Sequence, residues 1–345
     1  IQFLKAIPQR IFGTMTNEVL MAVPLFIFMG TILEKSKVAE DLLENMSKLL
    51  RHIRGGLGIS VTLVGALLAA STGIVGATVV TMGLLSLPTM LKNGYTPKLA
   101  TGVITAAGTL GQIIPPSIVL ILLGDVISNA YQQSQLKMGI FSPDTVSVGD
   151  LFAGSLFPGL LLVSLYIFYQ FLKAIFDPDS TPEMLIEENE ISYKKLIKTL
   201  FPPLALIIAV LGSILTGFAT PTEAASVGAI GSILLAANRI AKENFLTLLS
   251  AVSFIALLIL NFLFDLRLNR VDLNLYETFN IFLAVTIFVI FLISTILSIY
   301  KLYLSGVLVD ATRSSTKITS MVFIILIGAT FFSLVFRGLG GDETI

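Results

Sequence analysis

Nine stretches of this chain contain no Asp, Glu, Lys or Arg, and they set the strongest limit on how it can fold. A helix of about 20 apolar residues crosses the ~30 Å hydrocarbon core of a bilayer. The sequence therefore predicts an all-α polytopic membrane protein whose surroundings are a lipid bilayer. The nine stretches are residues 19–33, 55–91, 99–124, 151–172, 199–222, 224–238, 244–264, 278–300 and 318–336.

The second stretch, 55–91, is too long for one crossing, because 37 residues in one helix would extend about 55 Å. Two full crossings with a turn would need more residues than it contains. Its centre, Ala69 to Gly73, is small and polar, as a turn would be. We therefore predict a re-entrant helical hairpin. Its turn must pack in protein or face water, because lipid cannot bond its backbone groups.

The distribution of basic residues favours this hairpin, because cytoplasmic loops collect Lys and Arg. With 55–91 entering and leaving on one side, one set of loops holds 16 of the 22 basic residues; a single crossing would divide them much more evenly. We assign the basic side to the cytoplasm. It includes residues 34–54, whose apolar residues at helical spacing predict an amphipathic helix along the membrane surface.

The third stretch, 99–124, contains a predicted helix break. Pro115 and Pro116 lack amide hydrogens, and Gly108 and Gly111 relax the backbone further. In hydrocarbon, freed carbonyls favour a bound cation, and the N-terminus of the half-helix after the break suits a carboxylate. A kinked helix alone would more often be structural. A discontinuous helix beside a hairpin with a polar tip is the arrangement that transporters use to hold solute and ion.

These two features define the predicted site. Its neutral oxygens suit Na⁺ better than a transition metal. The predicted substrate- and ion-binding residues are Ser71, Thr72, Gly73, Thr105, Gly108, Thr109, Gly111, Gln112, Pro115, Pro116 and Ser117, with Na⁺ assigned to Ser71, Thr72, Gly108 and Thr109.

Residues 220–223 allow two interpretations. Glu223 could be a buried coupling carboxylate, with Thr220 and Thr222 as secondary ligands. Alternatively, Thr220 and Glu223 form a capping box around Pro221 at the start of a helix, and this interpretation is favoured. Several glycines are expected to allow close contacts between helices and to have no chemical role of their own, namely Gly65, Gly73, Gly76, Gly83, Gly228 and Gly231.

Composition excludes other classes. The formal net charge is zero, so no nucleic-acid partner is expected. With no Cys and a single His, most catalytic and metal-binding arrangements are missing. The spans also lack a nucleophile with an activating base. We therefore expect no enzyme and no cofactor, with Na⁺ as coupling ion. A passive channel built on the re-entrant hairpin is the alternative to a carrier.

Six runs carry a family resemblance. They are VPLFIFMG (23–30), GALLAASTGIVGATVVTMGLLSLPTML (65–91), AAGTLGQIIPPSIVLILLGD (106–125), VGDLFAG (148–154), GFATPTEAA (217–225) and FSLVFRGLGGDE (332–343). The chain resembles the large membrane subunit of tripartite ATP-independent periplasmic (TRAP) transporters. The resemblance implies an elevator-type fold in the bacterial inner membrane. It also implies Na⁺-driven import of organic acids, typically carboxylates or sugar acids, from a periplasmic solute-binding protein, with a small membrane subunit as partner.

Three departures from the family accompany the resemblance. An N-terminal helix expected of the family is absent, and the second hairpin and second broken helix are not in the chain, so we expect a fragment lacking the second half-site. An insert at 243–312 resembles a subgroup associated with mannitol or chloroaromatic acids. The predicted units are an N-terminal span with the arm helix (1–54), a transport unit (55–125), further spans with a cytoplasmic linker at 173–198 (126–242), the inserted helix pair (243–312) and the start of a second repeat (313–345).

Overall fold

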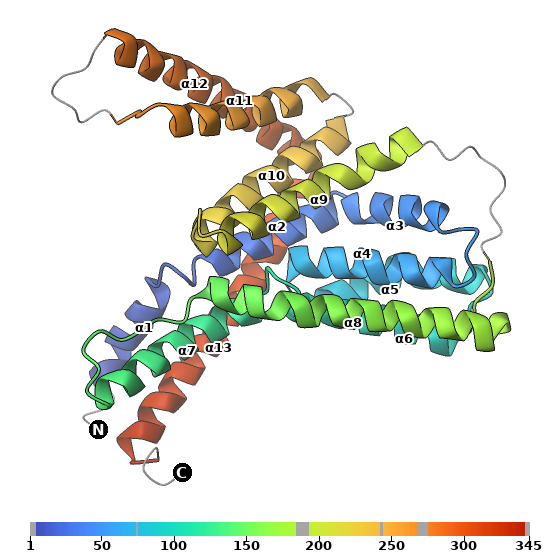
Figure 1. Cartoon of the computed structure of the whole chain (residues 1–345), viewed down its shortest axis with the longest axis horizontal. Coiled ribbons are helices and arrows are strands. Elements are labelled where there is room, and N and C mark those ends of the chain that lie inside the picture. The colour runs from blue at the N-terminus through green and yellow to red at the C-terminus, as the bar shows by residue number, and fades with distance from the viewer. Residues whose placement is uncertain (1–4, 74, 184–192, 242–243, 268–274, 342–345) are drawn as a thin grey trace.

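The computed structural model describes all residues except 1–4, 74, 184–192, 242–243, 268–274 and 342–345, and every regular element within the described residues is a helix (Figure 1). The elements are α1 (Ile7–Met15), α2 (Ala22–Lys35), α3 (Val38–Leu49), α4 (Gly56–Thr72), α5 (Val75–Lys92), α6 (Pro97–Thr109), the 3₁₀ turn η2 (Leu110–Gln112), α7 (Ile118–Lys137), α8 (Val148–Phe176), the 3₁₀ turn η3 (Pro178–Ser180), α9 (Tyr193–Leu215), α10 (Pro221–Ala241), α11 (Asn244–Leu263), α12 (Leu275–Leu304) and α13 (Val307–Gly338).

Helix α2 forms the centre of the core. It is apolar on nearly every face, as expected of a helix enclosed by others. Val23, Ile27, Met29 and Ile32 are fully buried, where α2 packs against α10, α13 and α4. The following helix, α3, is amphipathic and buries only one face, which includes Val38 and the two leucines after Asp41. Asp41 accepts two hydrogen bonds from the Arg239 guanidinium, which ties α3 to α10.

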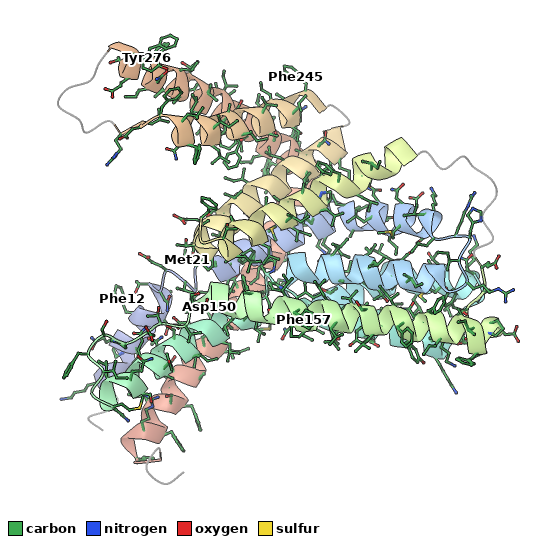
Figure 2. The ribbon with its side chains drawn as sticks, in the orientation of Figure 1. Phe12, Met21, Asp150, Phe157, Phe245 and Tyr276 are labelled. Carbon is green, nitrogen blue, oxygen red and sulfur yellow. The ribbon has the colours of Figure 1, made fainter. Side chains whose placement is uncertain are left out.

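Among the described residues, four helices are long and apolar enough to cross a membrane, namely α8, α11, α12 and α13. Their outer faces carry large exposed apolar side chains; Figure 2 shows Phe157, Phe245 and Tyr276 on the outside of the molecule. Exposed apolar surface on this scale is stable against lipid and not against water. The chain is therefore built as an integral membrane protein.

Helices α4, α5, α6 and α8 pack together as a bundle, in which α4 contacts each of the other three (Figure 1). Two contacts hold α4 against its neighbours. A Cβ atom placed on Gly65 would lie 2.7 Å from Ala107 Cβ, so α4 and α6 touch here. At the start of the same helix, the Gly58 amide donates to the Tyr95 hydroxyl at 3.3 Å, and burial raises the pKa of that phenol.

Helices α11 and α12 lie within residues 243–312, where the sequence predicts two hydrophobic helices. They pack along one another, and the buried Ser250 hydroxyl donates to Ser294 Oγ at 2.7 Å. Figure 1 shows this pair projecting from one end of the molecule, where it contacts α10 and α13. The two serines give the pair a polar contact across otherwise apolar surfaces.

Several boundaries differ from the sequence-based expectation. Helix α1 was not predicted, and the arm helix covers Val38–Leu49 rather than all of 34–54. The linker 173–198 is helical at both ends, because α8 extends to Phe176 and α9 begins at Tyr193. Charged residues end a hydrocarbon-spanning stretch, but a helix continues beyond it wherever water can solvate the charges.

The expected glycine contacts are confirmed in part. A Cβ on Gly228 would meet Met29 Sδ at 2.6 Å, and Gly231 approaches Leu206 closely. The expectation for Gly76 and Gly83 is wrong, because a Cβ on either would meet nothing within 4 Å. These two glycines lie on the face of α5 that has no neighbouring helix in the described chain.

Candidate functional site

The long uncharged stretch is divided at Gly73, as the sequence predicts. Helix α4 ends at Thr72 and α5 begins at Val75, and the two helices pack against each other. Gly73 has φ +61°, in the left-handed region that a residue without a Cβ adopts most readily. The side chains of Ser71 and Thr72 lie outside the described residues.

The third stretch is broken where the two prolines were predicted to interrupt it. Helix α6 ends at Thr109, η2 continues to Gln112, and α7 starts only at Ile118. Because residues 115 and 116 have no amide hydrogen, the carbonyls of Gly111 and Gln112 lose their usual helical donors. The Gln112 carbonyl is bonded instead by the Ser117 hydroxyl at 2.9 Å.

The turn of α4–α5 packs directly against this break. A Cβ placed on Gly73 would lie 3.0 Å from Ile118 Cγ1 and 3.4 Å from Ile118 N. One turn into α5, Val79 lies against Gly108: a Cβ on Gly108 would come within 3.1 Å of Val79 Cα. Both helices of the hairpin also contact η2. The structure therefore brings Gly73 together with the Ser117–Ile118 segment, and it places Gly108 against Val79, six residues further along α5.

Three helix ends meet at the contact between Gly73 and Ile118, and a fourth lies further along α5. Helix α4 ends at this junction and α5 and α7 begin there, whereas α6 ends at Thr109, next to the contact of Gly108 with Val79. A helix C-terminus presents unpaired carbonyls and partial negative charge, which suit a cation, whereas a helix N-terminus presents amide hydrogens and partial positive charge, which suit an anion. The junction thus offers both kinds of ligand from backbone alone.

The predicted side chains differ in how they are placed. Thr105 and Thr109 are exposed, and their hydroxyls donate to the carbonyls of Thr101 at 2.8 Å and Ala106 at 2.7 Å. Ser117 is buried and caps α7, accepting from the Leu120 amide at 3.4 Å. A hydroxyl that donates its hydrogen to a carbonyl retains lone pairs for an ion. Gly111, Pro115 and Pro116 are buried and Gln112 is half-buried within the break.

The capping interpretation of residues 220–223 is confirmed. Glu223 Oε2 accepts from the Thr220 amide at 2.8 Å and from its hydroxyl at 3.0 Å, and the Glu223 amide donates to Thr220 Oγ1 at 3.3 Å. These bonds lower the pKa of the exposed Glu223 carboxyl. Thr222 donates to the Glu18 carbonyl at 2.7 Å, so it joins α10 to the turn before α2.

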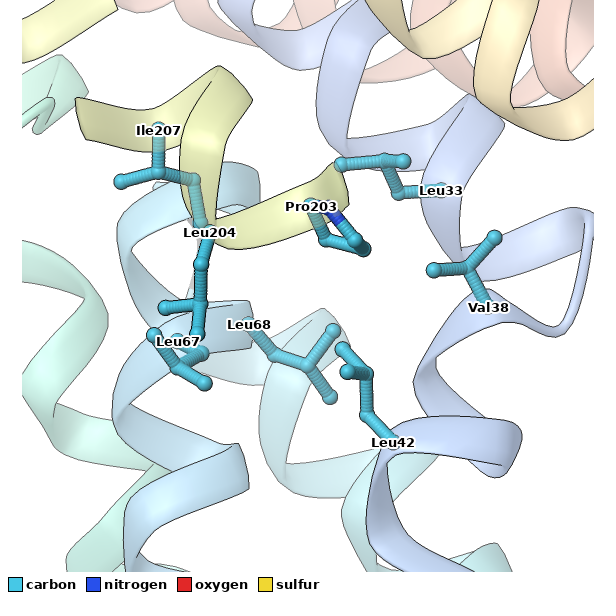
Figure 3. Close-up of a pocket in the computed structure, with 8 residues that line it drawn as sticks. All are labelled: Leu33, Val38, Leu42, Leu67, Leu68, Pro203, Leu204 and Ile207. Atoms are coloured by element: carbon cyan, nitrogen blue, oxygen red, sulfur yellow. The ribbon is translucent and has the colours of Figure 1, made fainter. Parts of the chain in front are cut away.

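Two cavities lie near the hairpin. The first, of about 10 Å³, is lined only by apolar side chains from α2, α3, α4 and α9, including Leu42, Leu68 and Pro203 (Figure 3). It holds at most one water, so we interpret it as a packing gap beside the hairpin. The second, of about 690 Å³, lies between α4, α6 and α8. None of the predicted site residues whose side chains the structure describes lines either one.

Sequence reasoning missed the residues of the larger cavity. The available signal was Gln170, a polar residue within the otherwise apolar α8. Polar residues inside a membrane helix usually face a protein interior or a watery cavity. Gln170 is 2% exposed, and its Nε2 donates to Thr62 Oγ1 at 2.6 Å.

The comparison with protein families decides what this fold belongs to. The family model described as tripartite ATP-independent periplasmic transporter, DctM component, matches residues 1–344. The chain belongs to the TRAP transporter large permease family. A transporter permease subunit is not an enzyme class, and the TRAP large permease is an integral membrane protein, in agreement with the four candidate spans.

Curated relatives of this TRAP permease are likewise described as TRAP transporter large permease proteins. The chain is 32% identical, over 64% of its length and 49% of the relative's, to the C4-dicarboxylate TRAP transporter large permease protein DctM of Rhodobacter capsulatus. It is 30% identical, over 63% of its length and 46% of the relative's, to the ectoine/5-hydroxyectoine TRAP transporter large permease protein UehC of Ruegeria pomeroyi. It is 27% identical, over 70% of its length and 52% of the relative's, to the sialic acid TRAP transporter large permease protein SiaM of Vibrio cholerae. The chain therefore spans about half the length of the curated relatives it matches.

Proposed function

We propose that this permease is the membrane subunit of a Na⁺-coupled secondary transporter that imports organic acids. The observation that carries the proposal is the contact between Gly73 at the hairpin turn and Ile118 at the start of α7. Two interrupted helices that meet are the elements with which secondary transporters bind solute and ion at the same level of the membrane.

The ion is assigned to the C-terminal ends of α4 and α6. Their carbonyls, together with the hydroxyls of Ser71, Thr72 and Thr109, supply neutral oxygens, which suit a hard monovalent cation. The backbone at Gly108 belongs to the same group. The organic acid is assigned to the N-terminus of α7, where Ser117 and Gln112 add polar groups to the helix amides.

The substrate class and partners follow from chemistry and from the relatives together. The relatives named above are described as transporters for C4-dicarboxylates, ectoines and sialic acid. A carboxylate is the group that a helix N-terminus binds best. The substrate is therefore an organic acid, delivered by a periplasmic solute-binding protein, with a small membrane subunit completing the system in the bacterial inner membrane.

The movement proposed is that of an elevator. The transport unit, residues 55–125, would carry the junction past the rest of the protein, with 55–91 as a re-entrant hairpin open to the cytoplasm. The small apolar gap in Figure 3 lies where α4 meets α2, α3 and α9. An apolar contact of this kind is one that a moving unit could exchange at low cost.

Coupling is tested by uptake of a radiolabelled C4-dicarboxylate into proteoliposomes that contain the permease, its small subunit and the binding protein. We expect uptake to require an inward Na⁺ gradient. Thr109→Val should raise the half-saturating Na⁺ concentration several-fold, since one ion–hydroxyl contact is worth roughly 1 to 2 kcal/mol.

Thr101→Val is the matched control, because the Thr101 hydroxyl is also exposed and also donates to a carbonyl of its own helix, that of Pro97 at 2.8 Å, two turns earlier on α6. It should leave the Na⁺ dependence unchanged. Equal uptake with and without the gradient would refute coupling. Unsaturable flux without the binding protein would indicate a channel.

The re-entrant hairpin makes a separate topological prediction. The chain has no Cys, so a single introduced thiol is a unique label. His52→Cys and Lys92→Cys are at exposed positions flanking α4 and α5, and Phe141, 94% exposed, lies between α7 and α8. A membrane-impermeant maleimide should label positions 52 and 92 from the cytoplasmic side and Phe141→Cys from the periplasmic side. Labelling of 52 and 92 from opposite sides would show that 55–91 crosses the membrane.

A further inference from the structure

The larger cavity is a groove with one polar end and one apolar wall. Its volume of about 690 Å³ is in the usual range for a small-molecule site. The apolar wall is formed by α6, through Leu99, Val103 and Ala106. The polar end is formed by Thr62, Thr96, Lys98, Tyr166, Tyr169, Gln170, Lys173, Asp177 and Ser180.

Gln170 anchors the groove to α4. Its amide nitrogen donates to Thr62 Oγ1, and its buried Oε1 lies against the α4 backbone, because a Cβ placed on Gly58 would come within 2.2 Å of this oxygen. A ligand in the groove therefore meets the lysines and the α6 wall and leaves the Gln170 side chain in place.

The charges at the polar end favour an anion. Lys173 pairs with Asp177 at 3.0 Å, which leaves Lys98 without an ion pair in the described part of the chain. The net charge of the ionisable groups lining the groove is therefore +1. Tyr166 and Tyr169 stand beside the lysines, as aromatic residues do at the headgroup level of a bilayer.

The groove opens beside a lipid-facing surface. Leu165 and Leu161 lie about one and two turns before Tyr169 on the same side of α8, and each is 50% exposed. Lys98 and Asp177 lie in segments assigned by loop charge to the cytoplasmic side. The groove is thus at the level where one end of a ligand would be wet and the other would enter hydrocarbon.

We propose that this groove binds the headgroup of an anionic phospholipid between α6 and α8. The phosphate is held by Lys98 with Lys173, and an acyl chain follows the apolar wall of α6. Basic pockets between membrane helices on the cytoplasmic side bind lipid headgroups in this way. A soluble organic anion would use the lysines but would gain nothing from Leu99, Val103 and Ala106.

Native mass spectrometry of the detergent-purified chain, titrated with phosphatidylglycerol or phosphatidylcholine, tests the proposal. Phosphatidylglycerol should bind more tightly. Lys98→Gln should weaken it about fivefold, because one lysine near an anionic headgroup contributes roughly 1 kcal/mol. Lys137→Gln, the same change at an exposed position at the end of α7, should leave binding unchanged. Circular dichroism verifies that both variants are folded.

Three outcomes would overturn the proposal. Equal binding of the two lipids would show that the site does not select an anionic headgroup. Equal weakening by both substitutions would show that the lipid does not bind in this groove. Displacement of phosphatidylglycerol by millimolar inorganic phosphate would assign the lysines to a soluble anion.

Discussion

Gly73→Val should reduce substrate uptake at least tenfold while leaving the chain folded in the membrane. A residue with a Cβ in the left-handed region costs roughly 1 to 2 kcal/mol, and more when it is β-branched. The new Cβ would also lie 3.0 Å from Ile118 Cγ1, so the turn must move away from α7. Because each 1.4 kcal/mol is a factor of ten, a combined cost of about 2 kcal/mol would leave a few per cent of the molecules with the junction closed.

Gly76→Val is the matched control for this prediction. Gly76 lies three residues further along, inside α5, and a Cβ there would meet nothing within 4 Å. Uptake by Gly76→Val should stay within about twofold of the parent. If both variants transport equally well, the contact between Gly73 and Ile118 has no part in the site.

The elements of this fold that could be predicted from sequence are those set by local backbone chemistry. Pro115 and Pro116 lack amide hydrogens in any fold, so the break before α7 follows from these two residues alone. The same is true of the turn at Gly73 and of the capping box between Thr220 and Glu223, whose groups are three residues apart.

The elements that could not be predicted depend on which helices become neighbours. Gly65 and Gly76 have similar apolar surroundings in sequence, yet only Gly65 meets another helix. The large groove needs α4, α6 and α8 packed together, and its polar residues are up to 118 positions apart, from Thr62 to Ser180. No periodicity in a single segment reports such a pairing.

For the candidate site too, the sequence predicts local features and does not predict how the packed helices place the side chains. Thr105 was predicted as a ligand because it precedes the break on α6, but its hydroxyl is exposed and bonded to its own helix. Ser117 was grouped with it by composition, and the structure buries Ser117 as the cap of α7. Sequence identifies which residues are polar near a break, whereas helix rotation decides which of them face the junction.

Gly108→Ala should destabilise the folded protein by about 1 to 2 kcal/mol, although Ala is the better helix former by about 1 kcal/mol. A Cβ at residue 108 would overlap Val79 Cγ2 and come within 3.1 Å of Val79 Cα, so α5 itself would have to shift, and not only a side chain.

Gly102→Ala, on the same helix with nothing within 4 Å of the new Cβ, should instead raise stability by up to about 1 kcal/mol. Thermal unfolding in detergent, followed by circular dichroism, measures both. Opposite signs for the two substitutions would show that α5 and α6 are held at backbone contact beside the break. If Gly108→Ala were also stabilising, α5 would not lie against Gly108, and the junction would lose the contact that holds α5 against the end of α6.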